Sequence, residues 1–286
     1  MRKNIETFIA CDAEYEDAKV VIFGAPFDST TSYRPGARFG SAAIRHESYG
    51  LETYSPYLNR DLDDINVYDA GDLELPMGST TKSLDDISVM TAEILDDGKL
   101  PLMMGGEHLV TLGAFREVQK RYPDVHIIHF DAHADLRDQY LDVQFSHACV
   151  MRRCYDLIGD GRIHQFGIRS GERAEFDFAR SGHTDFHPFT FEGLDGVVDD
   201  LASSRVPVYF TIDLDVLDPS IFPGTGTPEA GGVSFDELRK AMTQVCQRLN
   251  IVAIDVTELA PTLDPSGVST AVAGKVVREL LLAINQ

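Results

Sequence analysis

The strongest constraint on the fold of this chain is a pattern that recurs from end to end: a short apolar run that ends in Gly, Asp or Pro, followed by a longer amphipathic stretch. This alternation predicts βα units, in which parallel strands share one sheet. Eight runs are predicted to be strands, at residues 20–23, 65–69, 100–104, 125–130, 163–166, 185–189, 207–212 and 251–254. Most of them are apolar throughout, as expected where helices cover both faces of a parallel sheet. The sequence therefore predicts an α/β fold around a large, mostly parallel sheet.

The remaining segments indicate how the chain is organised around that sheet. Four amphipathic stretches are predicted to be helices: residues 84–97, 109–121, 235–249 and 269–284. The two longest irregular stretches, residues 27–40 and 218–232, are rich in Gly and Pro, and loops of that length in a compact domain are usually functional. Because no linker or internal repeat divides the chain, residues 1–286 are predicted to form one domain.

The charge and the apolar runs exclude several classes of protein. The chain has 25 Lys and Arg residues against 46 Asp and Glu residues, a formal net charge of −21. We expect no nucleic-acid or anionic-membrane partner, because like charges oppose the encounter. No apolar run approaches the roughly 20 residues that span a bilayer, and residues 1–17 turn acidic before a signal-type stretch develops. The four cysteines form no CxxC pair, which is typical of reduced thiols, so a cytoplasmic location is expected.

Acids and imidazoles directly follow four of the predicted strands. The segments are GGEH at 105–108, DAHAD at 131–135, DLD at 213–215 and DVTE at 255–258. Any one of these aspartates would more often be a turn former or a helix N-cap. However, ligands of parallel α/β sheets bind at the carboxyl ends of the strands, where these segments meet. In an extended segment, residues 131, 133 and 135 also point the same way, so their side chains are predicted to converge.

Such a concentration of acids indicates bound metal. Crowded carboxylates raise each other's pKa and resist ionisation, and divalent cations remove that cost. The candidate ligands are two imidazoles and four carboxylates: His108, Asp131, His133, Asp135, Asp213 and Asp215. This set is too large for one ion, whereas two divalent ions would balance the four carboxylates and could share bridging ones. Oxygen-rich ligation with some imidazole and no thiolate favours Mn²⁺.

The other histidines divide into three groups. His147 follows the DAHAD segment in the same connection and is predicted to overhang the site as a proton-transfer residue. His126 and His129 lie inside a predicted strand and are interpreted as hydrogen-bonded structural residues. The remaining four have no converging acidic partner nearby in the sequence: His46, His164, His183 and His187.

These motifs resemble those of the ureohydrolases, the family of arginase, agmatinase, formiminoglutamase and guanidinoacid hydrolases. The likeness is carried by GGEH, by FDAHAD at 130–135 and by TIDLDVLDPSIFPGTGTPEAGG at 211–232. It extends to PFDSTTSYRPGARFG at 26–40 and DVTELAPTLD at 255–264, and so covers nearly the whole chain. The resemblance implies a three-layer α/β/α sandwich around an eight-stranded parallel sheet, and an assembly of three or six copies.

The resemblance also implies roles for the candidate residues. One manganese ion would be held by His108, Asp131, Asp135 and Asp213, and the other by Asp131, His133, Asp213 and Asp215. Glu258 matches the carboxylate that receives the substrate guanidinium, and a carboxylate can bind that planar cation bidentately. His147 matches a proton shuttle, and Asp135 and His147 are the candidate proton carriers. Metal ions lower the pKa of bound water to about 7, which supplies the nucleophile that a guanidinium requires.

Two positions indicate the substrate. Where arginases carry an Asn and an acid that recognise the amino-acid head group, this chain has Arg137 and Ser170. The surrounding segments resemble those of bacterial and archaeal agmatinases, which hydrolyse agmatine to putrescine and urea. The alternatives are guanidinobutyrate, whose carboxylate Arg137 could pair, formiminoglutamate and arginine.

Two other classes fit the sequence less well. A two-metal phosphoesterase would generally need Lys or Arg clamps on phosphate, and the segments 105–108, 131–135 and 213–215 contain none. A non-catalytic relative would be expected to lose a ligand, but all six ligand matches and Glu258 are present.

Overall fold

The core of the molecule is an eight-stranded sheet in which every neighbouring pair of strands is parallel. A computed structural model of the protein describes residues 6–285. The strand order is β4-β1-β5-β10-β9-β6-β7-β8. In chain order these strands are β1 (Val20–Ala25), β4 (Val67–Asp72), β5 (Leu100–Gly105), β6 (His126–Phe130), β7 (Ile163–Ile168), β8 (Asp185–Pro188), β9 (Pro207–Asp213) and β10 (Asn250–Thr257). All eight predicted strands are confirmed, and the short β2 (Tyr54–Ser55) and β3 (Arg60–Asp61) pair separately.

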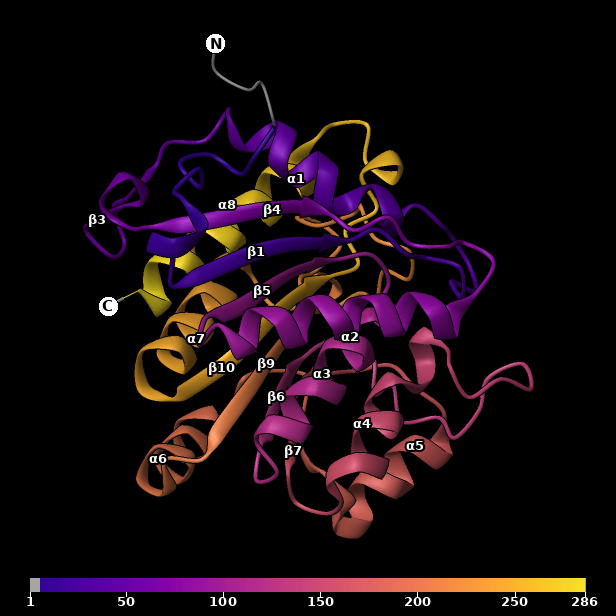
Figure 1. The fold of residues 1–286 in the computed structure, drawn as a ribbon. Helices are drawn as coiled ribbons and strands as arrows, with labels where there is room; N and C mark the ends of the chain where they lie inside the picture. The colour runs from indigo at the N-terminus through magenta and orange to yellow at the C-terminus, as the bar shows by residue number, and fades with distance from the viewer. Residues whose placement is uncertain (1–5, 286) are drawn as a thin grey trace.

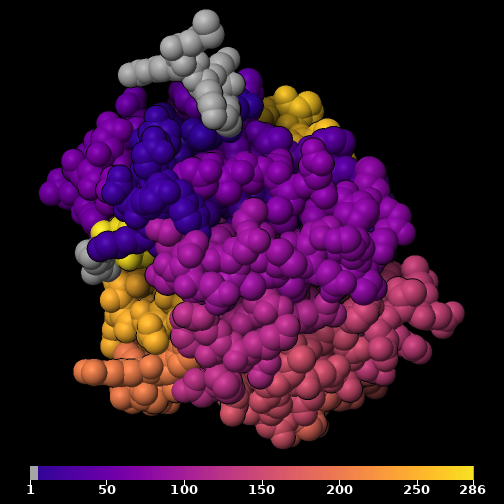
Figure 2. Space-filling view, viewed as in Figure 1, coloured from indigo at the N-terminus to yellow at the C-terminus, as the bar shows by residue number. Residues whose placement is uncertain are grey.

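The helices form a layer on each face of the sheet (Figure 1). They are α1 (Gly40–Ser48), α2 (Thr80–Asp96), α3 (Val110–Arg121), α4 (Val150–Ile158), α5 (Arg173–Phe178), α6 (Leu194–Ser204), α7 (Phe235–Arg248) and α8 (Val268–Ile284). One buried core lies between the sheet and α1, α6, α7 and α8, and the other between the sheet and α2, α3 and α4. Figure 2 shows that the α2–α3 segment covers the middle of one face. The predicted three-layer architecture is therefore confirmed.

The sequence predicted α2, α3, α7 and α8 but not the other four helices. The missed helices are short, and α5 has only six residues, so hydrophobic periodicity has too few turns in which to appear. By contrast, α7 has a clear start: the Ser234 hydroxyl accepts from the Glu237 N–H, and the Glu237 carboxylate accepts from the Ser234 N–H.

Strands β9 and β10 extend further than predicted, which places the functional segments more exactly. The parallel ladder between them continues until Thr257 pairs with Asp213. Asp213 is therefore the last residue of β9, and Asp255 lies inside β10, whereas the sequence placed both after their strands. Because β5, β10, β9 and β6 are neighbours in that order, their carboxyl ends bring the four polar segments to one edge of the sheet.

Several other expectations concern segments outside this core. The loop 218–232 contains no helix or strand, and 27–40 contains only a single 3₁₀ turn (Ala37–Phe39) before α1 begins. The four cysteines are free and buried: Cys11, Cys149, Cys154 and Cys246. Within residues 6–285, no helix has both the length and the apolar character needed to span a bilayer. The expected absence of a signal segment involves residues 1–5, which lie outside the described residues. The assignment of residues 1–286 to one domain stays a prediction.

Candidate metal centre and active site

His108 is the centre of a first cluster of candidate ligands. Its Nδ1 atom lies 3.0 Å from Asp131 Oδ2, 3.1 Å from Asp135 Oδ2 and 3.5 Å from Asp213 Oδ2. This nitrogen is buried and makes no hydrogen bond. The structure thus brings together the four residues predicted to hold one ion.

The tautomer of His108 is set by its other ring nitrogen. His108 Nε2 lies 2.9 Å from Thr211 Oγ1, and the Thr211 hydroxyl donates to Asp255 Oδ1 at 2.6 Å. Because that hydroxyl hydrogen is already used, Thr211 Oγ1 accepts from His108 Nε2–H, and Nδ1 is the nitrogen that faces the carboxylates. Burial opposes a charge on this ring, but the carboxylates of Asp131 and Asp135 outweigh it and raise the pKa of His108 well above its usual range. Three carboxylates therefore stabilise positive charge at Nδ1, and a metal ion bound there would take the place of a proton. Asp255 therefore serves to orient a candidate ligand, a role that its place in the sequence did not indicate.

A second cluster surrounds His133. His133 Nδ1 lies 3.0 Å from Asp215 Oδ2 and 3.5 Å from Asp131 Oδ1. Asp215 Oδ2 is buried without a hydrogen-bond partner, while Asp215 Oδ1 accepts from the Ala132 N–H. Asp213 Oδ1 accepts from the Asp215 N–H at 2.8 Å, while its Oδ2 faces His108, so Asp213 connects the backbone of one cluster with the histidine of the other. Asp131 directs one oxygen to each cluster, as a bridging ligand would.

The donor set fits divalent cations. Among the described residues, eight buried side-chain atoms lack a hydrogen-bond partner, and two of them, His108 Nδ1 and Asp215 Oδ2, belong to predicted ligands and face carboxylates or imidazole. Burial, and then the carboxylates of Asp215 and Asp131, raise the pKa of Asp213 well above its usual range. Burial and then Asp131 raise the pKa of Asp135 to about 7. Both shifts reflect the cost of burying a charge first and repulsion between carboxylates second, and cations between the groups would offset both.

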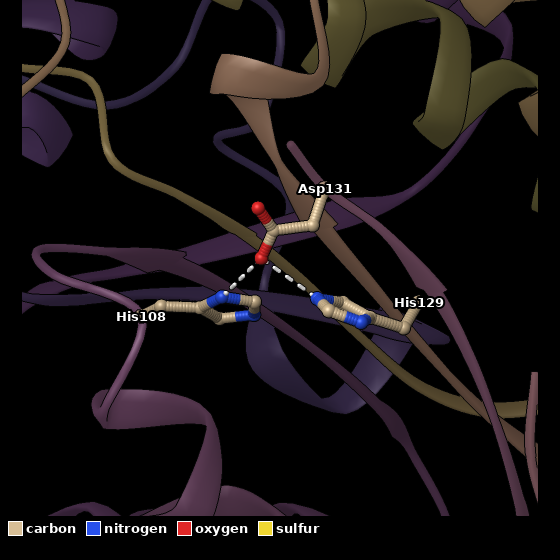
Figure 3. Close-up of side chains that lie close together, drawn as sticks. All are labelled: His108, His129 and Asp131. Carbon is tan, nitrogen blue, oxygen red and sulfur yellow. Dashed lines mark hydrogen bonds and ion pairs between the residues drawn. The ribbon is translucent and has the colours of Figure 1, made fainter. Parts of the chain in front are cut away.

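His129 hydrogen-bonds to Asp131 but is not placed as a ligand (Figure 3). Its Nε2 lies 2.8 Å from Asp131 Oδ2. The Gln165 amide nitrogen, fixed by its bond to the Ala134 carbonyl, also donates to His129 Nδ1. His129 Nδ1 is therefore the acceptor, and Nε2–H donates to Asp131. His129 is hydrogen-bonded, as interpreted from the sequence, and the two-residue spacing along the strand was the signal for its contact with Asp131.

The remaining histidines have acidic partners that the sequence left unassigned. The pairs are His46 with Glu6, His164 with Asp185, His183 with Asp160 and His187 with Asp185. The expectation was wrong for His187, because Asp185 stands only two residues before it and, in β8, points to the same side. The other three partners come from more distant segments. His126 lies 3.0 Å from His164 in a separate cluster.

Glu258 and His147 line a cavity of about 240 Å³ that opens over both clusters. Glu258 Oε1 accepts from the His108 N–H at 2.7 Å, and the φ of Glu258 is +68°, a strained value for this residue type. Burial and then Glu107 raise the pKa of Glu258 well above its usual range. The backbone is also closely packed at this edge of the sheet. Only glycine fits at position 106, because a Cβ there would lie 1.9 Å from the Phe27 carbonyl oxygen.

His147 lies at the start of a 3₁₀ turn above the clusters. Its N–H donates to Thr30 Oγ1 at 3.0 Å, and its Nε2 lies 3.3 Å from Ser32 Oγ. Burial lowers the pKa of His147 to about 4, so the imidazole is neutral near pH 7 and can accept a proton. The structure therefore brings the predicted proton carrier to the same cavity as the candidate ligands.

The outer wall of the cavity contains Arg137 and Ser170. Arg137 Nη1 lies 2.6 Å from Glu172 Oε1, and its Nε lies 3.3 Å from Glu175 Oε2. Ser170 Oγ donates to Glu229 Oε1 at 2.8 Å. Arg137 is thus already paired with two carboxylates, which the sequence did not indicate.

The fold and the two histidine–aspartate clusters are those of a known class of enzymes. The arginase family model matches residues 18–283, and the chain belongs to this family of ureohydrolases. It is similar to the agmatinases of Bacillus cereus and Bacillus subtilis, each 46% identical over 279 residues that cover 97% of this chain and 96% of the relative. Among solved structures, the agmatine ureohydrolase of Thermoplasma volcanium has a TM-score of 0.89 at 32% identity, covering 99% of this chain and 95% of that one.

Proposed function

We propose that this enzyme hydrolyses agmatine to putrescine and urea, with two Mn²⁺ ions per subunit. The observation that carries the choice of substrate is the pairing of Arg137 with Glu172 and Glu175. Among the described residues that line the cavity, Arg137 is the only Lys or Arg side chain. A substrate carboxylate would have to displace these two acids from Arg137. A dicationic substrate needs no such displacement, and the charge of Arg137 that would repel it is already paired. The similarity to agmatinases supports the same choice.

The two ions would be held by the clusters around His108 and His133, with Asp131 and Asp213 shared. Bound divalent ions supply hydroxide at neutral pH by lowering the pKa of water. Their oxygen-rich donor set, with two imidazoles and no thiolate, suits Mn²⁺.

The protein side chains then bind the guanidinium and move protons. Glu258 can accept hydrogen bonds from the guanidinium and hold its carbon over the clusters. Addition of oxygen to that carbon and cleavage of one C–N bond yield urea, and the departing amine takes up a proton to leave as putrescine. His147, neutral near pH 7, is placed to take a proton during the reaction and return it to the amine, and Asp135 is the second candidate carrier.

Three wider expectations remain proposals. We retain a homo-oligomer of three or six copies, a cytoplasmic location, and the absence of a nucleic-acid or membrane partner. The oligomer follows from the family resemblance, the location from the four cysteines that form no CxxC pair, and the absence of such partners from the charge of −21.

A urea-release assay tests the proposal directly. The protein is stripped of metal, reconstituted with Mn²⁺ and offered agmatine, arginine and guanidinobutyrate. We expect kcat/KM for agmatine to exceed that for arginine by roughly 10- to 100-fold, since a buried carboxylate without a partner costs about 1 to 3 kcal/mol or more. A preference for arginine would identify an arginase, and a preference for guanidinobutyrate would mean that Arg137 leaves its acidic partners.

A further inference from the structure

We propose that Glu229 binds the distal ammonium group of the substrate and so sets the preference for a diamine-type guanidine. This inference rests on the proposed hydrolysis of a guanidinium and adds the residue that reads the other end of the molecule. Glu229 belongs to the loop 218–232, which the sequence singled out as long and rich in Gly and Pro.

The loop spans the cavity from the guanidinium end outward. A Cβ on Gly226 would lie 3.8 Å from Glu258 Oε2, so this part of the loop borders the predicted guanidinium carboxylate. Three residues later, Glu229 Oε1 lies 3.9 Å from His133 Nε2, on the side of the ring that faces away from the ligand atom Nδ1. Three residues of chain span at most about 10 Å. The carbon-to-ammonium distance of an extended aminobutylguanidine is about 7 Å from standard bond lengths of about 1.5 Å, so the two ends of such a molecule could meet Glu258 and Glu229.

The Glu229 carboxylate is held in place by a hydroxyl group and has no Lys or Arg partner among the described residues. Ser170 Oγ donates to Glu229 Oε1 at 2.8 Å, and within residues 6–285 no Lys or Arg side chain pairs with this carboxylate. The Glu229 carbonyl accepts from Arg169 Nη2 at 2.8 Å, and the same nitrogen donates to the Asp215 carbonyl. Arg169 therefore ties the backbone of Glu229 to that of a candidate ligand, which fixes its place relative to the clusters.

The charge around the outer cavity favours a cation there. Two Arg side chains lie near Glu229. Arg137 pairs with Glu172 and Glu175, and Arg169 donates to backbone carbonyls and, among the described residues, makes no ion pair with the Glu229 carboxylate. Glu229 is left with an open oxygen at the cavity wall. An ammonium group can donate up to three hydrogen bonds to such acceptors, whereas a carboxylate at this place would face Glu229 directly.

The test compares two substrates that differ only at the distal end. Agmatine carries an ammonium group, and pentylguanidine carries a methyl group in its place. In Glu229→Gln, which keeps the acceptor for Ser170, we expect KM for agmatine to rise about tenfold with a smaller change in kcat, and the kinetics of pentylguanidine to stay unchanged. Glu229→Lys should reverse the charge preference and raise kcat/KM for guanidinobutyrate relative to agmatine. Glu192→Gln, an exposed acid outside the cavity, is the matched control.

Each outcome decides a specific point. An unchanged KM for agmatine in Glu229→Gln overturns the proposal. An equal rise for both substrates, or loss of bound Mn²⁺ measured on the same samples, would assign Glu229 to holding Ser170 or His133 and would also overturn it. If the unmodified, Mn²⁺-reconstituted enzyme releases urea from neither guanidine, the proposed function fails independently of Glu229.

Discussion

The contact between His129 and Asp131 leads to a prediction about metal affinity. Replacing His129 with Phe keeps a ring in β6 but removes both nitrogens. The 2.8 Å hydrogen bond to Asp131 Oδ2 is lost, and the Gln165 amide loses its acceptor at Nδ1. His129 is 0% exposed, so water is not available to replace the donor. Asp131 would then keep the bond from the His133 N–H to its Oδ1 but lose the donor that orients its Oδ2.

The expected magnitude follows from what such contacts do elsewhere. Partners that orient a metal ligand typically change metal affinity or activity by 10- to 100-fold. That range corresponds to about 1.4 to 2.8 kcal/mol of binding free energy. His129→Gln should restore most of this loss, because its amide N–H can reach the place of the imidazole Nε2–H. We therefore expect Mn²⁺ affinity to fall in the order wild type, His129→Gln, His129→Phe.

Calorimetric titration of the metal-free protein with Mn²⁺ measures this order. His126→Phe is the matched control, because it changes a histidine of the same strand that lies outside the clusters. Thermal unfolding in the presence of chelator shows whether the variants are folded before metal is added. Unchanged affinity in a folded His129→Phe would refute the reasoning, and so would equal losses in His129→Phe and His126→Phe.

Four shorter predictions follow from the same geometry. Stripping the metal should abolish urea release. Asp131→Asn should lower the rate of urea release more than His108→Ala does, because Asp131 faces both clusters, and equal rates and metal contents in the two variants would contradict that shared role. His147→Ala should lower kcat by roughly 10²- to 10⁴-fold with little change in KM, and an unchanged kcat would exclude a proton-transfer role. Glu258→Gln should lower kcat/KM for agmatine and arginine alike, because both carry the guanidinium, and a loss confined to one substrate would argue against that contact. Burial, and then His164, lower the pKa of His126 to about 4, below the ordinary value of about 6.5 that the unfolded chain keeps. Between these values the unfolded chain binds more protons, so stability falls as the pH drops from about 6.5 to 4, and His126→Gln should reduce that loss by about 1 kcal/mol in denaturant titrations at pH 7 and 5.

Local patterns in the sequence determined the strands and the candidate ligands. The six inner strands are buried along most of their length, so their apolar runs could be recognised without knowledge of their neighbours. The edge strands β4 and β8 are partly exposed and were recognised from shorter apolar segments. The acids and imidazoles stand out because they follow those runs, and parallel strands necessarily end at one edge. The short helices α1, α4, α5 and α6 were missed, since they contain too few turns to show a period.

Contacts between distant segments were decided only by the tertiary structure. The sequence left Arg137 available to a substrate carboxylate. In the structure it pairs with Glu172, the residue just before α5, and with Glu175 in the first turn of that helix. The proton on His108 Nε2 is directed by Thr211 and Asp255, which reach it from β9 and β10. Residue spacing along one segment cannot reveal such pairings, because they depend on how separate elements pack around the sheet. The sequence thus determined which groups gather at the site, and packing decided which of them remain free to bind metal or substrate.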